Sequence, residues 1–202
     1  MRQAVDQLRA GSSAKRRGAA KRLRALADPA AGPALLESLQ VEATDPQTWE
    51  TQYQMVMALG ACHHTRAVAF LEQLVLEQTA YTMLGVALGD ALVRIEWTTI
   101  GSLTAIDRLM RSKAPAVIDG SFRALAILRL VPDEGLIGRI FDRVETLDPS
   151  DHLRFWVAAA AAGWSGPRVV AYLNACLASP RKEIAEVAAA SLLGKYTNHR
   201  VL

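Results

Sequence analysis

The feature that most constrains the fold is a helical pattern that repeats about every 33 residues. An apolar residue near the end of every second predicted helix recurs at steps of 33, 33, 36, 33 and 32 residues, at Leu26, Leu59, Leu92, Leu128, Ala161 and Leu193. Prolines stand in the breaks, as in Asp28-Pro29 and Asp45-Pro46. Each helix has an apolar stripe that needs a neighbour, so several repeats must stack before any one is stable.

The stretch 49–75 shows the pattern most clearly. Its first helix places four residues on one face, Tyr53, Val56, Met57 and Gly60. After a polar break, a second helix carries its own apolar face, Val68, Leu71, Leu74 and Val75. Aromatic residues make up only 6% of the chain, and no stretch alternates as a strand does. The sequence therefore predicts an all-α fold of stacked helix pairs.

We predict one domain over residues 1–202, a length that suits a single continuous core. The predicted helix pairs lie at about 12–43, 46–78, 80–112, 114–147 and 149–179, with a final helix over 182–196. In the third pair, Thr98 or Ser102 is expected to begin the second helix. The tail from Thr197 to Leu202 is expected to fray.

Charge is distributed unevenly along the chain. Residues 1–27 carry eight Lys or Arg and one acid, a net charge of +7, whereas residues 28–96 carry a net charge of −7. The two cysteines, Cys62 and Cys176, are far apart in sequence, which favours reduced thiols over a disulfide framework. No secretory signal is recognisable, and the longest uncharged run, 15 residues at 51–65, is shorter than the roughly 20 that cross a bilayer. We therefore expect a soluble, cytoplasmic protein.

Three segments resemble one family of repeats: RRGAAKRLRALADPAAGPALLESL from Arg16, MVMALGACHHTRAVAFLEQLV from Met55 and EIAEVAAASLLGKY from Glu183. They look like HEAT repeats, particularly the short bacterial form found in phycobilisome-lyase-type proteins. The first segment fits that pattern best, at Arg16, Ala19, Ala20, Leu23 and Leu26. The resemblance implies a right-handed α-solenoid of about five helix pairs and a final helix. It also implies a scaffold that binds other macromolecules along the layer formed by the second helix of each pair.

No catalytic motif accompanies the repeats. The chain lacks a nucleophile elbow, a glycine-rich phosphate loop and an H-E-x-x-H sequence, so we expect no enzyme activity and no cofactor. Cys62-His63-His64 offers three metal-ligand side chains in one turn, but a site needs ligands that converge from separated positions, and we predict no metal. Single glycines within helices, Gly60, Gly85, Gly89, Gly120 and Gly138, are expected to allow close helix packing.

Two features keep a nucleic-acid-binding protein open as the alternative. The basic N-terminal segment, with Lys15, Arg16, Arg17, Lys21, Arg22 and Arg24, could contact phosphates, although its charges also suit a solvated helix face. Trp97, Phe155, Trp156 and Trp164, with Asp90 or Asp151, could form the pocket of an alkylpurine DNA glycosylase-like enzyme. The acidic block at 28–96 would repel the phosphates of a DNA duplex, which counts against the glycosylase-like alternative. A bilin-handling lyase is a third, weaker alternative implied by the resemblance.

The candidate partner-binding residues lie on the second helices of the pairs. When the apolar positions expected to be buried are left out, the polar positions of these helices are mainly acidic in the first half of the chain and rich in arginine in the second half. The candidate residues are Glu37, Glu72, Gln73, Glu77, Asp107, Arg108, Arg111, Arg139 and Arg143. We therefore predict a non-catalytic protein-binding scaffold or adaptor. One form of it is an immunity-type protein that masks a toxin, and the acidic half would suit a basic partner such as a nuclease domain.

Overall fold

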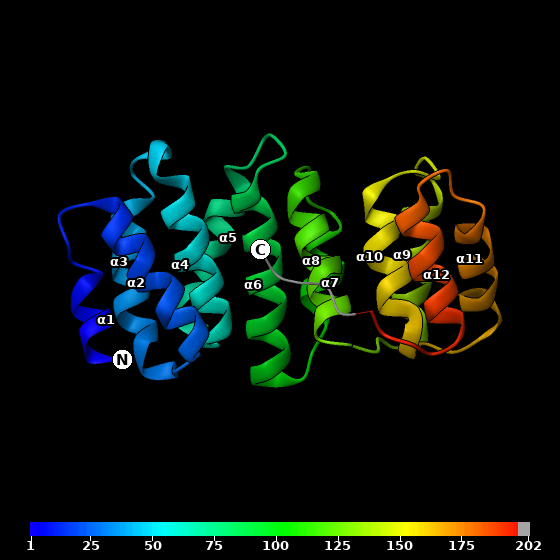
Figure 1. Cartoon of the computed structure of the whole chain (residues 1–202), viewed down its shortest axis with the longest axis horizontal. Coiled ribbons are helices and arrows are strands. Elements are labelled where there is room, and N and C mark those ends of the chain that lie inside the picture. Colours follow the sequence, from blue (N-terminus) through cyan, green and yellow to red (C-terminus); the bar gives the residue numbers. More distant parts are fainter. Residues whose placement is uncertain (198–202) are drawn as a thin grey trace. The chain divides into compact units, whose positions relative to one another are not determined.

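The computed structural model describes residues 1–197, and within them every regular element is a helix (Figure 1). The α-helices of this range are α1 (Arg2–Gln7), α2 (Ser13–Leu26), α3 (Gly32–Glu42), α4 (Trp49–Ala61), α5 (Val68–Leu76), α6 (Met83–Ile100), α7 (Thr104–Leu109), α8 (Pro115–Ile127), α9 (Glu134–Glu145), α10 (His152–Ala160), α11 (Pro167–Leu177) and α12 (Lys182–Leu192). Short 3₁₀ turns join some of them: η1 (Pro29–Ala31), η2 (Pro46–Thr48), η3 (Thr65–Ala67) and η4 (Ala161–Gly163). The predicted all-α fold is confirmed.

Contacts divide the chain into two compact units, residues 1–121 and 122–202. In the first unit, α4 packs between α2 and α6, while α3 packs against α4 and α5 against α6 (Figure 1). In the second unit, α12 packs against both α10 and α11. The helices thus form hairpins whose first members stack on one another. The single domain, the repeat boundaries and the right-handed superhelix stay predictions.

Two details differ from the sequence-based expectations, and a third expectation is not tested. The short helix α1 precedes the first predicted helix and packs against α2. Helix α6 continues to Ile100, so Thr98 does not begin the next helix; α7 begins at Thr104, whose backbone N–H donates to the Ser102 hydroxyl over 3.2 Å. The predicted frayed tail lies, apart from Thr197, outside the described residues.

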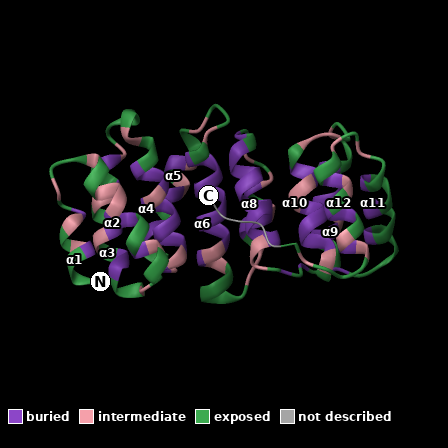
Figure 2. Ribbon diagram, viewed as in Figure 1, coloured by how far each residue is buried: buried purple, intermediate pink, exposed green. Residues whose placement is uncertain are grey.

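The core follows the stacked first helices. Met55 and Leu59 in α4 and Leu88 in α6 are fully buried, and buried residues line the facing sides of α4 and α6 (Figure 2). Two markers of the period are exposed, Leu26 at 54% and Leu193 at 70%, and a third, Leu128, is half-buried. Leu26 is the last residue of α2 and Leu193 follows the last residue of α12, so both mark the repeat without entering the core.

Glycines let the backbones of α6 and α8 approach closely. A Cβ atom added at Gly89 would overlap the carbonyl oxygen of Val117, and one at Gly120 would overlap that of Val86. Close packing is confirmed at two more of the predicted positions, Gly60 and Gly85. It is not required at Gly138, where the nearest atom would be an ordinary 3.7 Å away.

No helix within residues 1–197 is both long enough and apolar enough to pass through a lipid bilayer.

Candidate partner-binding surface

The structure places the predicted partner-binding residues on the second helix of each pair. Glu37 lies on α3, Glu72 and Gln73 lie on α5, and Glu77 follows the last residue of α5. The remaining members belong to α7 and its C-terminal turn, Asp107, Arg108 and Arg111, and to α9 in the second unit, Arg139 and Arg143. Glu72 and Asp107 are half-buried, and the other members are exposed.

Neighbouring repeats pair these charges with one another. Arg108 Nε lies 3.0 Å from Glu72 Oε1, and an Nη of the same guanidinium lies 3.3 Å from Glu96 Oε2. Glu37 pairs with Arg9 at 3.4 Å. The acidic half is therefore partly neutralised within the chain. Such exposed pairs contribute at most about 1 kcal/mol each, so a partner can break them at small cost.

A mostly apolar groove of about 610 Å³ lies between α5 and α7. We call it the Arg108 groove; it is lined by Glu72, Val75, Leu76, Gln78, Arg108, Leu109, Arg111, Ser112 and Lys113. Leu76 is 84% exposed at its edge. Three of the predicted residues, Glu72, Arg108 and Arg111, thus meet at one concave feature.

A second groove lies where α4, α5 and α6 approach one another at their ends. This Trp49 groove has a volume of about 590 Å³ and is lined by Ala43, Pro46, Trp49, Gln52, Leu74, Glu77, Gln78, Thr82, Met83 and Leu84. Of its lining, only Glu77 was predicted from the sequence. Trp49 is 46% exposed, which is unusual for so large an apolar side chain. Its place just outside the buried stripe of α4 is the signal that could have identified it.

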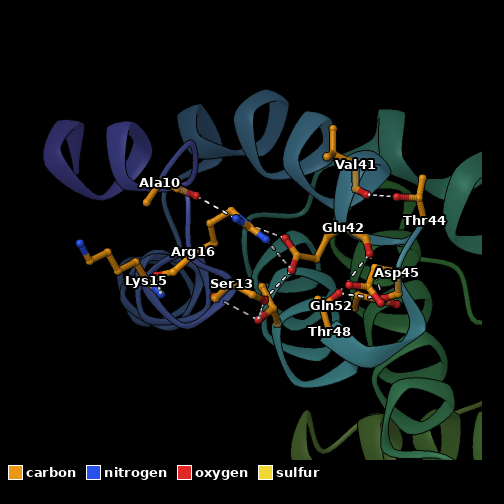
Figure 3. A network of polar contacts seen from close by, with 12 residues as sticks. Ala10, Ser13, Lys15, Arg16, Val41, Glu42, Thr44, Asp45, Thr48 and Gln52 are labelled. Atoms are coloured by element: carbon orange, nitrogen blue, oxygen red, sulfur yellow. Dashed lines mark hydrogen bonds and ion pairs between the residues drawn. The ribbon is translucent and has the colours of Figure 1, made fainter.

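One arginine of the basic helix α2, Arg16, is directed into the protein. Arg16 reaches Glu42 at the end of α3, with Nε–Oε2 and Nη2–Oε1 distances of 2.6 and 3.0 Å (Figure 3). Its Nη1 also donates to the Ala10 carbonyl oxygen over 2.8 Å. The hydroxyl of Ser13 donates to Glu42 over 2.6 Å and lies 2.7 Å from the hydroxyl of Thr51. This network ties three helices of the first unit together.

The same network closes the C-terminus of α3. The amide nitrogen of Gln52 donates to the carbonyl oxygens of Glu42 and Asp45 over 3.1 and 2.8 Å, and the Thr48 hydroxyl donates to both (Figure 3). A helix end leaves carbonyl groups without intrahelical partners, and side chains of α4 and η2 satisfy these. Glu42, only 3% exposed, therefore has a structural role.

Two opposing effects set the pKa of Glu42. Burial by itself would raise the pKa, but hydrogen bonds from Arg16 and Ser13 and the attraction of Arg16 outweigh it, so the pKa lies below the ordinary 4.5. The hydrogen bond to Glu42 raises the pKa of Arg16 above its ordinary value. Both groups are thus charged at neutral pH.

Other members of the basic segment also have partners within the chain. Arg17 pairs with Glu50 on α4, and Arg22 donates a hydrogen bond to Gln7 on α1. Together with Arg16, these side chains are engaged in packing the first unit. The contacts of Arg17 and Arg22 lie at the surface, where a phosphate backbone could replace them at small cost, so they do not decide against the nucleic-acid alternative.

The aromatic residues proposed for a base-binding pocket have separate structural roles. Trp164 is buried in the second unit, where its indole N–H donates to the Leu130 carbonyl oxygen over 2.9 Å. Phe155 and Trp156 pack edge to face in α10, with their ring centroids 5.0 Å apart. Trp97 lies in the last turn of α6 and is 37% exposed.

The two candidate carboxylates are also accounted for. Asp90 is fully buried and forms an ion pair with Arg94 one turn further along α6. Asp151 caps α10 by accepting the backbone N–H of Leu153 over 2.8 Å. Neither carboxylate lines either groove.

The Cys62-His63-His64 turn serves packing between repeats. Burial raises the pKa of the Cys62 thiol to about 11, so the thiolate is disfavoured at neutral pH. His63 adopts a left-handed backbone conformation with φ of 52°, and the His64 imidazole fills the space that a Cβ at Gly32 would occupy. Burial lowers the pKa of both histidines. Among residues 1–197, no three His, Cys, Asp or Glu side chains gather as metal ligands do.

Comparison with known proteins identifies the kind of repeat. A family model described as PBS lyase HEAT-like repeat matches residues 15–40, which extend from α2 through η1 into α3. No curated protein matches the chain. The match covers one helix hairpin, and the other hairpins follow it in architecture. Repeats of this kind generally form scaffolds with extended binding surfaces for other proteins.

Proposed function

This chain is a HEAT-like repeat protein, and from that premise we propose that it is a non-catalytic scaffold that binds another protein through the Arg108 groove. The observation that carries the proposal is the composition of that groove. Its lining combines the apolar residues Val75, Leu76 and Leu109 with Glu72 from α5 and the two arginines that follow it in the chain, Arg108 and Arg111. Exposed apolar surface rimmed by charge is typical of protein-interaction sites.

The charges along this groove suit a partner that presents a cation opposite Glu72 and an anion opposite the arginines. Glu72 and Arg108 already pair with each other, so a partner that presents a cation and an anion can exchange this pair for two intermolecular ones. Lys113 adds a cation at the same groove, and among residues 1–197 it has no ion-pair partner. An immunity-type protein that masks a basic toxin is the finer form of the proposal, supported by the net charge of −7 over residues 28–96.

The test begins with co-purification from the native host and identification of the partner. Association kinetics are then measured at several salt concentrations for the wild type and for Glu72→Lys, which reverses the acid that lines the Arg108 groove. At low salt, the wild type should associate with a basic partner about tenfold faster than the variant does, because attraction between complementary surfaces accelerates encounter. Glu183→Lys, which reverses an exposed acid in the second unit, is the matched control.

The outcome separates specific binding from general charge effects. If Glu183→Lys slows association as much as Glu72→Lys does, or if Glu72→Lys associates as fast as the wild type, the Arg108 groove is not the binding surface. A toxin partner would support the immunity form, whereas any other protein partner would leave only the scaffold.

A further inference from the structure

The Trp49 groove differs from the Arg108 groove in its charge. Among its ten lining residues, Glu77 is the only ionised side chain, and no Lys or Arg contributes to the lining. Within residues 1–197, Glu77 has no ion-pair partner, unlike Glu37 and Glu72. The groove therefore presents one uncompensated negative charge beside apolar walls.

Two neutral polar side chains of this groove, Gln52 and Thr82, already donate hydrogen bonds within the protein. Gln52 donates its amide hydrogens to backbone carbonyl groups over 2.8 and 3.1 Å. The Thr82 hydroxyl donates to the side-chain oxygen of Gln78 over 2.6 Å and accepts the backbone N–H of Gly85 over 3.0 Å. A ligand that seeks neutral hydrogen-bond partners thus finds few. The carboxylate of Glu77 remains as the main polar attraction.

The apolar walls suit a long, slender side chain with a charged end. Trp49 and Met83 are 46% and 40% exposed, and Leu74 and Leu84 line the groove more deeply. A cation is attracted to the face of an indole ring, and an aliphatic stem packs on apolar surface while its charged end stays polar. An anion would meet Glu77 unfavourably, and a purely apolar group would bury that carboxylate without a partner.

We propose that the Trp49 groove binds an arginine side chain on an extended segment of a partner protein. The guanidinium stacks on Trp49 and pairs with Glu77, and the aliphatic stem packs against Leu74 and Met83. Arginine fits better than lysine because its planar, weakly hydrated cation stacks on aromatic rings and forms bidentate pairs with carboxylates. This inference rests on the proposed function, but it concerns a different groove and a defined chemistry.

The test uses capped tripeptides and the intact protein, so it needs no identified partner. Acetyl-Leu-Arg-Leu-amide is titrated while the indole N–H resonances are followed by NMR, and the spectrum of Trp49→Phe assigns the Trp49 signal. The same tripeptide with citrulline, which is nearly isosteric with arginine and uncharged, is the matched ligand control. We expect the arginine peptide to bind about tenfold more tightly than the citrulline peptide, and a lysine peptide to fall between them.

Variants locate the site. Glu77→Gln should reduce the preference for arginine over citrulline to about twofold or less, because the charge-assisted hydrogen bonds are lost. Trp49→Leu should weaken arginine binding about fivefold while preserving the far-UV circular dichroism spectrum. Glu72→Gln, which removes an acid of the Arg108 groove, should leave the affinity for the peptide unchanged.

Equal binding of the arginine and citrulline peptides would overturn the inference, as would a Trp49 resonance that does not move during the titration. The inference would also fail if Glu72→Gln weakened peptide binding as much as Glu77→Gln does. Failure here is distinguishable from failure of the scaffold proposal. A partner that binds through the Arg108 groove while the peptide does not bind would remove only the arginine site. Peptide binding at Trp49 with no effect of the Arg108 groove variants on a partner would remove only the proposed function of that groove.

Discussion

Replacement of Glu42 by glutamine tests whether the buried polar network holds the first unit together. The substitution keeps the volume of the side chain and an oxygen that can accept from the Ser13 hydroxyl, which donates over 2.6 Å. It removes the charge that Arg16 contacts at 2.6 and 3.0 Å. We expect a clear loss of stability, because the Arg16 cation is then left in a partly buried place without its counter-charge.

The exposure of the Glu42 and Arg16 side chains sets the size of the expected loss of stability. The Glu42 side chain is 1% exposed and the Arg16 side chain 23%. Removal of one member of a fully buried pair costs about 3 to 5 kcal/mol. Because water still reaches part of Arg16 and an acceptor for Ser13 is kept, we expect about 2 kcal/mol. For a chain of this length, that corresponds to a decrease of about 4 to 8 °C in Tm.

Urea unfolding followed by circular dichroism measures the change. The matched control is Glu37→Gln, which breaks the exposed Arg9–Glu37 pair, with side chains 75% and 68% exposed, and should change stability by no more than about 0.5 kcal/mol. The double variant with Arg16→Met should lose less than the sum of the two single variants, because the two residues interact directly. If Glu42→Gln were no less stable than Glu37→Gln, the network would not stabilise the fold.

The same pair predicts a dependence on pH. The pKa of Glu42 is lower in the folded protein than its ordinary 4.5, so the folded state binds the proton more weakly than the unfolded state does. The stabilisation is therefore complete well above pH 4.5 and is lost as the pH falls through the lower, folded-state pKa. The difference in stability between wild type and Glu42→Gln should shrink over that acid range. A difference that stayed constant down to acid pH would contradict the assignment.

Four further outcomes follow from the helix packing, the environment of the Cys62 thiol and the distribution of charge. Gly120→Ala should cost about 2 to 3 kcal/mol in urea unfolding, since its Cβ would overlap the Val86 carbonyl oxygen; a neutral effect would refute the close approach of α6 and α8. Trp164→Phe should cost about 2 kcal/mol because it removes the donor to a buried carbonyl. A thiol reagent at pH 8 should not modify Cys62 in the folded protein and should modify it in urea, because burial raises its pKa to about 11; rapid reaction without urea would show that the thiol is accessible. A gel shift with duplex DNA should show no complex at low salt, and a complex that weakens steeply with salt would restore the nucleic-acid alternative.

The helical repeat could be predicted from the sequence because its cause is local. The period of apolar residues sets which face of each helix is buried, and dipeptides such as Asp28-Pro29 and Asp45-Pro46 end one helix and cap the next turn. In the structure, Asp28 and Asp45 accept backbone N–H groups two residues further along, over 2.9 Å each. Close helix packing at the glycines of α6 and α8 could also be predicted from the sequence, since a glycine inside a helical pattern has few roles other than close packing.

The candidate site was only partly predictable. Glu72, Arg108 and Arg111 were identified because they remain on the polar side of their helices after the buried stripe is subtracted. Trp49 was missed, because a single exposed aromatic residue at the start of a helix looks like a core residue in the sequence. The grooves themselves depend on how the ends of three helices approach one another, which no local pattern records.

The sequence alone thus determined where most of the helices lie, which of their faces are apolar and which of them carry charge. Only the tertiary structure decided which charges neutralise one another: Arg108 meets Glu72 from the preceding repeat, whereas Glu77 is left without an ion pair among residues 1–197. The reason is physical. Helical periodicity acts over three to four residues, whereas ion pairing between repeats depends on how residues more than thirty positions apart are placed by the stacking of whole hairpins.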